Sequence, residues 1–140
     1  MNPVTTFTWE VRVYYEDTDS GGVVYYANYL RFMERARTEW LRALGFEQDR
    51  LIREQGIVFA VRSAHVEYLR PARFNDLLIV VSALQQHGRA SLTFDHTIIR
   101  QHEASRPCCT GEVKIACINA DTFRPQPIPD TLLEEIVDGS

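Results

Sequence analysis

One long segment with a helical repeat constrains the fold more than any other feature of the sequence. From about residue 24 to residue 44, apolar residues recur every three or four positions, while most charged residues fall on the other faces. The apolar positions are Tyr29, Phe32, Met33, Ala36, Trp40 and Leu44. Gly45 follows at once, and glycine is the usual left-handed stop of a helix. A stripe this broad needs a curved sheet to bury it.

The segments on either side of this helix predict strands. Residues 7–15 alternate apolar and polar or smaller side chains, which is the period of a half-buried strand. Four further strands are expected over residues 57–68, 77–86, 89–100 and 110–119, with a short helical turn over 51–55 and a terminal helix over 130–137. Successive strands joined by short turns pair antiparallel. The order predicts an α+β fold with one long helix on a five-stranded antiparallel sheet.

Length and composition predict one soluble domain. The 140 residues are 45% hydrophobic and show no linker or internal repeat, so we expect a single domain over residues 1–140. A net charge of -4, with basic residues scattered along the chain, gives no basic face for nucleic acid. Nucleic acid is therefore excluded as an expected partner.

Membrane insertion and export are not expected either. No stretch approaches the roughly 20 apolar residues of a membrane helix, and the first residues show neither a basic start nor an apolar signal core. The three cysteines are an odd number, and Cys108 and Cys109 are adjacent, so no disulfide framework is indicated. A reducing cytoplasmic location fits these observations.

The junction between the first strand and the long helix carries the densest group of reactive side chains. Residues 15–29 read YEDTDSGGVVYYANY, with three carboxylates and two glycines in one turn. Such residues favour ordinary solvated turns and helix starts. A helix start also offers unpaired N–H donors and a partial positive charge, which would polarise a carbonyl oxygen. Residue spacing alone leaves both interpretations open.

In the functional interpretation, Asp19 would face the carbon of that carbonyl group. Gly21 and Gly22 carry no Cβ and would let a substrate approach the backbone closely. The carboxylate of Asp19 would either attack that carbon directly or activate a water molecule. The sequence does not decide between these two roles.

Three segments resemble the hotdog thioesterases of the 4-hydroxybenzoyl-CoA thioesterase superfamily, and most closely the YbgC-like acyl-CoA thioesterases encoded with the Tol-Pal system. They read VRVYYEDTDSGGVVYYANY, FMERARTEWLR and VEYLRPARFNDLLIV. The resemblance covers most of the chain. It implies the hotdog fold, in which a five-stranded antiparallel sheet wraps one long helix. It also implies hydrolysis of an acyl-CoA thioester to the free acid and CoA.

The resemblance assigns roles to particular residues at the junction. It implies that Asp19 is the catalytic carboxylate, that the backbone N–H of Tyr26 polarises the thioester carbonyl, and that Asp17 is structural. Many YbgC-like proteins carry histidine at the position of Tyr26. A role for an imidazole there does not carry over, whereas the backbone donor does not depend on the side chain.

The expected substrate-binding residues are Gly22, Tyr25, Tyr29 and Arg89. Gly22 would allow the close approach, and the two tyrosines would line the acyl pocket, although aromatic residues beside a helix start are commonly core residues. Arg89 follows the turn at His87 and Gly88, where the 4-hydroxybenzoyl-CoA enzymes carry a basic stretch that contacts the nucleotide. Arg89 would then bind a CoA phosphate, although an exposed turn arginine is usually solvated surface.

No metal and no dissociable cofactor are expected. The four histidines lack the spacing of a metal site, and the sequence has no G-x-S-x-G elbow, phosphate loop or dinucleotide-binding glycine pattern. Cys108 and Cys109 have no identifiable histidine partner and are interpreted as buried apolar residues.

Two other functions compete with thioester hydrolysis. A hotdog dehydratase would need a histidine in the pocket, and the junction contains none. A non-catalytic module that binds acyl chains or acyl carrier protein would use Asp19 only to cap a turn. The carrier of the acyl group, CoA or acyl carrier protein, stays open. The exposed sheet edge and the fold resemblance imply a homodimer with joined sheets, or a homotetramer of two such dimers.

Overall fold

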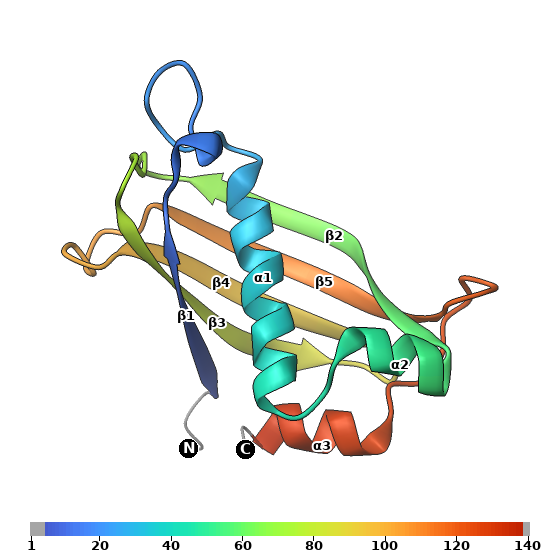
Figure 1. Ribbon diagram of the computed structural model, residues 1–140. Helices are drawn as coiled ribbons and strands as arrows, with labels where there is room; N and C mark the ends of the chain where they lie inside the picture. Colours follow the sequence, from blue (N-terminus) through green and yellow to red (C-terminus); the bar gives the residue numbers. More distant parts are fainter. Residues whose placement is uncertain (1–4, 139–140) are drawn as a thin grey trace.

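The computed structural model describes residues 5–138, in which one long helix crosses one face of a five-stranded antiparallel sheet (Figure 1). The strands are β1 (Thr6–Arg12), β2 (Ile57–Tyr68), β3 (Leu77–His87), β4 (Ser91–Arg100) and β5 (Cys109–Asn119). The helices are α1 (Asn28–Ala43), α2 (Gln48–Gln55) and α3 (Asp130–Asp138), with a single 3₁₀ turn at Tyr15–Asp17. The strands lie in the order β1-β3-β4-β5-β2. This layout confirms the predicted α+β hotdog architecture.

The junction between β1 and α1 differs from its sequence-based prediction at both ends. The strand ends at Arg12 instead of residue 15, and the helix begins at Asn28 instead of residue 24. Val23 and Val24 are extended because they form isolated bridges with Arg73 and Thr18, respectively. These bridges lengthen the connection and make it a loop of its own.

The long helix is seated tightly on the sheet. Phe32, Met33 and Ala36 are completely buried, as the apolar stripe predicts. A Cβ atom added to Gly111 of β5 would lie only 2.7 Å from the Met33 sulfur, so glycine lets the helix approach the sheet backbone. Trp40 packs between Phe7 and Phe94, with ring centroids 5.8 Å and 5.6 Å away. Gly45 has a φ of 95°, which confirms the predicted left-handed stop.

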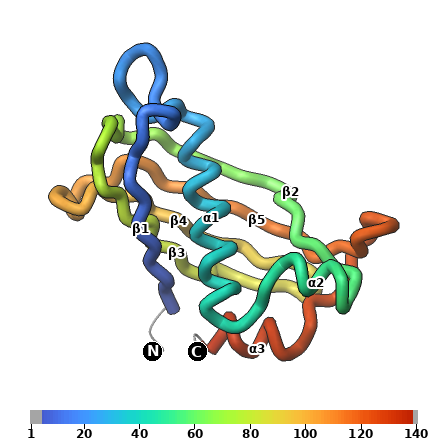
Figure 2. Tube along the Cα trace, viewed as in Figure 1, coloured from blue at the N-terminus to red at the C-terminus, as the bar shows by residue number. Residues whose placement is uncertain are grey.

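The predicted hairpin of β3 and β4 is present and defines two opposite ends of the sheet. The strands pair antiparallel from Leu78 with Arg100 to His87 with Leu92. The turn that joins them lies beside α2 and α3, whereas the β1–α1 loop lies at the other end of the sheet, near one end of β2 (Figure 2). None of the helices in the described part of the chain has the length and apolar character needed to span a bilayer.

A charged side chain on the buried face of α1 is part of a polar chain inside the core. Arg37 is only 7% exposed, and its Nη1 atom donates to Nε2 of His96 at 3.0 Å. Nδ1 of His96 must then carry the ring proton and donate to the Ser82 hydroxyl at 2.7 Å. Burial is the main cause that lowers the pKa of His96 from 6.5 to about 3, and the neighbouring Arg37 charge lowers it further. His96 is therefore neutral in the folded protein at neutral pH.

We predict that this histidine makes the fold sensitive to mild acid. Because the folded-state pKa is depressed, the contribution of His96 to stability is present above about pH 6.5 and is lost as the pH falls toward about 3. Between pH 7 and pH 5 the free energy of unfolding should fall by about 2 kcal/mol through this residue. Urea denaturation of the parent and of His96→Gln at both pH values would measure it. Parallel losses in the two proteins would contradict the assignment.

Candidate active site

Asp19 lies at the base of a tight hairpin loop in the β1–α1 connection. The Asp19 N–H donates to the carbonyl of Val23 at 2.9 Å, and the Gly22 N–H donates to the carbonyl of Asp19 at 3.0 Å. Gly22 takes a φ of 80°, which matches hairpin loops that end in a left-handed residue. Figure 1 shows that this loop projects from the molecule, and paired backbone groups hold its base.

The carboxylate of Asp19 is exposed and has a partner at one oxygen. Its Oδ1 atom accepts from the Gly21 N–H at 2.8 Å, which is the bond of an Asx turn. Among residues 5–138, no hydrogen bond reaches its Oδ2 atom. Asp19 thus caps its own turn, as expected if this segment is an ordinary solvated turn, and still presents one free carboxylate oxygen.

Asp17 is held by several bonds, unlike Asp19. Its carboxylate accepts from the Tyr14 N–H at 2.8 Å, and its own N–H donates to the Tyr14 carbonyl at 3.0 Å. Its carbonyl accepts from the Tyr25 N–H and from the Asn28 side-chain amide, both at 2.9 Å. This geometry supports the structural role expected for Asp17.

The start of α1 presents free amide donors. The Asn28 N–H donates to the Tyr25 carbonyl at 2.8 Å, so the first turn begins just before the helix proper. Within the described chain, the N–H groups of Tyr26 and Ala27 have no acceptor. The first turn of α1 also carries no acidic residue that would neutralise the positive end of the helix dipole. These donors are available to a carbonyl oxygen of a ligand.

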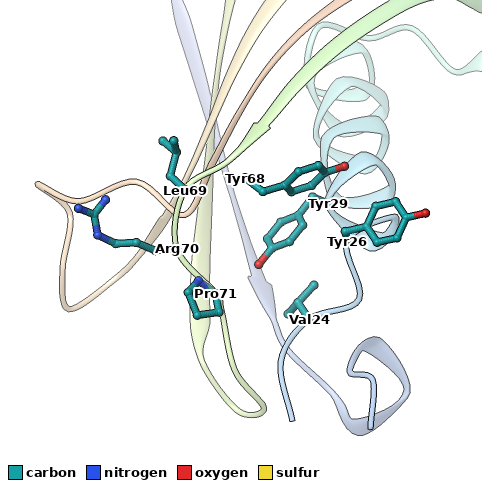
Figure 3. A pocket seen from close by; sticks show the side chains of 7 residues that line it. All are labelled: Val24, Tyr26, Tyr29, Tyr68, Leu69, Arg70 and Pro71. Carbon is teal, nitrogen blue, oxygen red and sulfur yellow. The ribbon is translucent and has the colours of Figure 1, made fainter. Parts of the chain in front are cut away.

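A pocket of about 260 Å³ opens beside this helix start (Figure 3). Its lining residues come from the end of the loop, the first turn of α1 and the end of β2: Val24, Tyr26, Tyr29, Tyr68, Leu69, Arg70 and Pro71. The rings of Tyr26 and Tyr29 lie 5.9 Å and 5.7 Å from the ring of Tyr68. Arg70 points away from these three rings. The pocket wall nearest the helix is therefore aromatic.

Two tyrosines of the pocket, Tyr29 and Tyr68, are neutral phenols. Burial is the main cause that raises the pKa of Tyr29 to about 12, and its hydroxyl accepts from the Ala72 N–H at 3.1 Å. Burial also raises the pKa of Tyr68. Tyr25 does not line the pocket, but its ring lies 4.8 Å from that of Tyr26, and a hydrogen bond between the two side chains raises its pKa.

The structure places all the expected site residues except Arg89 in the junction of β1 and α1. Gly22 lies in the loop with Asp19, and Tyr25, Tyr26 and Tyr29 lie at the helix start. Arg89 follows β3, a strand of 11 residues whose first residue pairs with Arg12 next to the site. Such a strand is about 33 Å long, so Arg89 lies at the far end of the sheet. Within one chain it does not meet the other residues.

Sequence reasoning missed the contribution of β2 to the pocket. Tyr68 is the last residue of this strand, and only the pairing of β2 with β5 places it against the helix start. An aromatic residue at a strand end just before the Leu69–Pro71 turn was the available signal. Among residues 5–138 no group of three or more metal-binding side chains is present.

Known thioesterases are similar to this chain over most of its length. Residues 13–136 match the family described as the thioesterase-like superfamily. The acyl-CoA thioesterase YbgC of Haemophilus influenzae is 41% identical, over 88% of this chain and 88% of the relative. The acyl-CoA thioester hydrolase YbgC of Escherichia coli O6:H1 is 40% identical, over 94% and 96%. The crystal structure of a probable thioesterase from Bartonella henselae superposes with a TM-score of 0.82 at 33% identity, covering 89% of this chain and 99% of the other.

The hairpin loop yields a prediction about stability. A Cβ atom at Gly22 would meet nothing within 4 Å, so a side chain there strains only the backbone. Gly22→Ala should lower the free energy of unfolding by about 1 kcal/mol, because its φ of 80° is left-handed. Gly22→Asn should cost less, since asparagine tolerates this conformation. Denaturant unfolding that shows alanine equal to glycine would contradict the loop geometry.

Proposed function

Because the chain belongs to the thioesterase-like superfamily, we propose that it hydrolyses acyl-CoA thioesters at the junction of β1 and α1. The supporting observation is the exposed, partly free carboxylate of Asp19 in the loop that leads into a helix start with unpaired amides and an aromatic pocket. Relatives about 40% identical over most of the chain are named as acyl-CoA thioester hydrolases, which supports the same chemistry here.

In the proposed reaction, the acyl group lies in the aromatic pocket and its carbonyl oxygen accepts from the Tyr26 N–H. Gly22 lets the thioester approach the loop backbone, and Tyr25 supports the ring of Tyr26. The helix dipole and the amide donor stabilise the negative charge that develops on the oxygen. Neutral Tyr29 and Tyr68 add apolar surface without a charge that would oppose this oxyanion.

Asp19 supplies the group that attacks or activates. As a general base, it takes a proton from water, whose oxygen attacks the thioester carbon. The tetrahedral intermediate then collapses, the carbon–sulfur bond breaks, and the thiolate of CoA leaves and takes up a proton. As a nucleophile, the carboxylate oxygen displaces the thiolate to give a mixed anhydride, which water hydrolyses. Both routes consume one water, use no cofactor and release the free acid and CoA.

A non-catalytic acyl-binding module is the second candidate. The Asx turn formed by Asp19 Oδ1 is the observation that favours it, because a turn-capping aspartate needs no further role. The same pocket would then hold an acyl chain borne by CoA or by acyl carrier protein. Turnover by the purified protein distinguishes the two functions.

The three cysteines of the chain are buried free thiols, which supports a reducing cytoplasmic setting.

We also propose that two copies join through the edge of β2. This strand ends one side of the sheet and exposes Val61, with 57% of its surface accessible, and Tyr68, with 48%. Because Tyr68 also lines the pocket, a second copy on this edge would close the site. Arg89 lies too far away to serve the site of its own chain, so a contact with CoA phosphates would come from another copy. Two such dimers would make a tetramer.

The first functional prediction concerns the two aspartates. Asp19→Asn should lower kcat for acyl-CoA hydrolysis by about 10² to 10⁴, because the amide is neither a base nor a nucleophile of useful strength. Asparagine can still accept from the Gly21 N–H, so the fold should survive. Asp17→Asn is the matched control, with a loss below about tenfold, because it keeps the cap on Tyr14.

Thiol release from a panel of acyl-CoA chain lengths measures both rates, and circular dichroism confirms folding. If Asp19→Asn retains a rate within about tenfold of the parent, the catalytic role of Asp19 is wrong and the binding module gains support.

The second functional prediction concerns the subunit interface. Light scattering should give twice or four times the chain mass of 16.2 kDa at micromolar concentration. Val61→Glu should shift the protein toward a monomer, because a charge on the paired edge opposes the apolar contact. Val137→Glu is the control, since Val137 is exposed on α3. A monomeric parent, or a Val61→Glu protein of unchanged mass, would contradict the interface.

A further inference from the structure

Asn28, the first residue of α1, makes a contact that joins the two halves of the proposed site. It is 8% exposed, and its side-chain Nδ2 donates to the backbone carbonyl of Asp17 at 2.9 Å. The two residues are eleven positions apart in sequence. Asp19 lies two residues after one end of this bond, and Tyr26 lies two residues before the other. The bond therefore ties the carboxylate loop to the segment that carries the amide donor.

The acceptor of this bond is itself firmly placed. Asp17 exchanges bonds with Tyr14 through its N–H and its carboxylate, and its carbonyl also accepts from the Tyr25 N–H at 2.9 Å. The carbonyl thus uses both of its lone pairs on the start of α1. In the described chain, the Asn28 amide is the one side chain of α1 that bonds to the loop. It adds a side-chain bond to the backbone bonds that already close the loop.

The type of residue at position 28 is informative. A helix start favours acidic side chains and side chains that accept from the helix amides, because of its positive dipole end. Asn28 does not follow this preference: its side chain donates a hydrogen bond to the Asp17 carbonyl in the loop. An aspartate of almost the same shape would suit the helix end at least as well but would lack the donor. A requirement for asparagine would therefore report on the bond to Asp17 and not on helix formation.

We propose that Asn28 is a positioning residue for thioester hydrolysis. Its amide fixes the Asp19 loop against the start of α1. The Asp19 carboxylate and the Tyr26 N–H can then act on the same thioester carbonyl group. This inference rests on the proposed function. Displacement of catalytic groups by about 1 Å can cost about 10²-fold in rate, so loss of the bond should appear in kcat more than in binding.

The test compares Asn28→Asp and Asn28→Ala with the parent. Each should lower kcat by roughly 10-fold to 100-fold while KM stays within about threefold. Asn28→Ala keeps the test decisive if the buried aspartate prevents folding. Asn119→Ala is the matched control, because Asn119 makes similar turn contacts with Asp121 and Gln126 at the far end of the sheet. Its kcat should equal that of the parent.

A double-variant cycle separates positioning from general loss of structure. Because Asn28 acts through Asp19, Asn28→Ala placed on Asp19→Asn should cause less than about a threefold further loss. A full, independent loss in that background would overturn the proposal, as would a folded Asn28→Ala protein with kcat within threefold of the parent. Failure of the proposed function would look different, because the parent itself would release no thiol from acyl-CoA.

Discussion

The close seat of α1 on the sheet is the constraint on which the site depends. Met33 lies directly against the backbone of Gly111, and the stacked rings of Trp40 and Phe7 hold the other end of the helix. With both contacts made, the helix has little freedom to slide or turn. Its first turn is therefore held at one end of the sheet, next to the end of β2. The positive end of the α1 dipole therefore lies at this end of the sheet.

The β1–α1 loop uses this fixed helix start as its anchor. Asp17 is tied to the strand side through Tyr14 and to the helix side through Tyr25 and Asn28. Asp19 lies two residues further along. In the described chain, its carboxylate makes a single hydrogen bond, which closes its own turn. Asp17 thus stabilises the loop, whereas Asp19 keeps one carboxylate oxygen free. Asp19 thus carries an exposed charge in a loop that Asp17 ties to the start of α1.

The sequence predicts most of the architecture because its periodicities are strong and local. The stripe from Tyr29 to Trp40 and the alternation in the later strands mark the helix and the sheet. The local pattern places the ends of β1 and α1 wrongly, because it does not show that Val23 and Val24 form isolated bridges with Arg73 and Thr18. The contact of Tyr68 with the helix start likewise depends on strand pairing. The burial of Arg37 depends on a partner, His96, that is 59 residues away.

The measurement that tests the central claim most directly is a crystal structure with a non-hydrolysable acyl-CoA analogue in which a methylene group follows the carbonyl in place of sulfur. The account predicts the acyl group in the pocket of Tyr26, Tyr29 and Tyr68, with its carbonyl oxygen about 2.7 to 3.1 Å from the Tyr26 nitrogen. The free oxygen of Asp19 should face the carbonyl carbon directly or through one water. An analogue whose carbonyl lies away from the start of α1, or whose carbon is out of reach of Asp19, would contradict it.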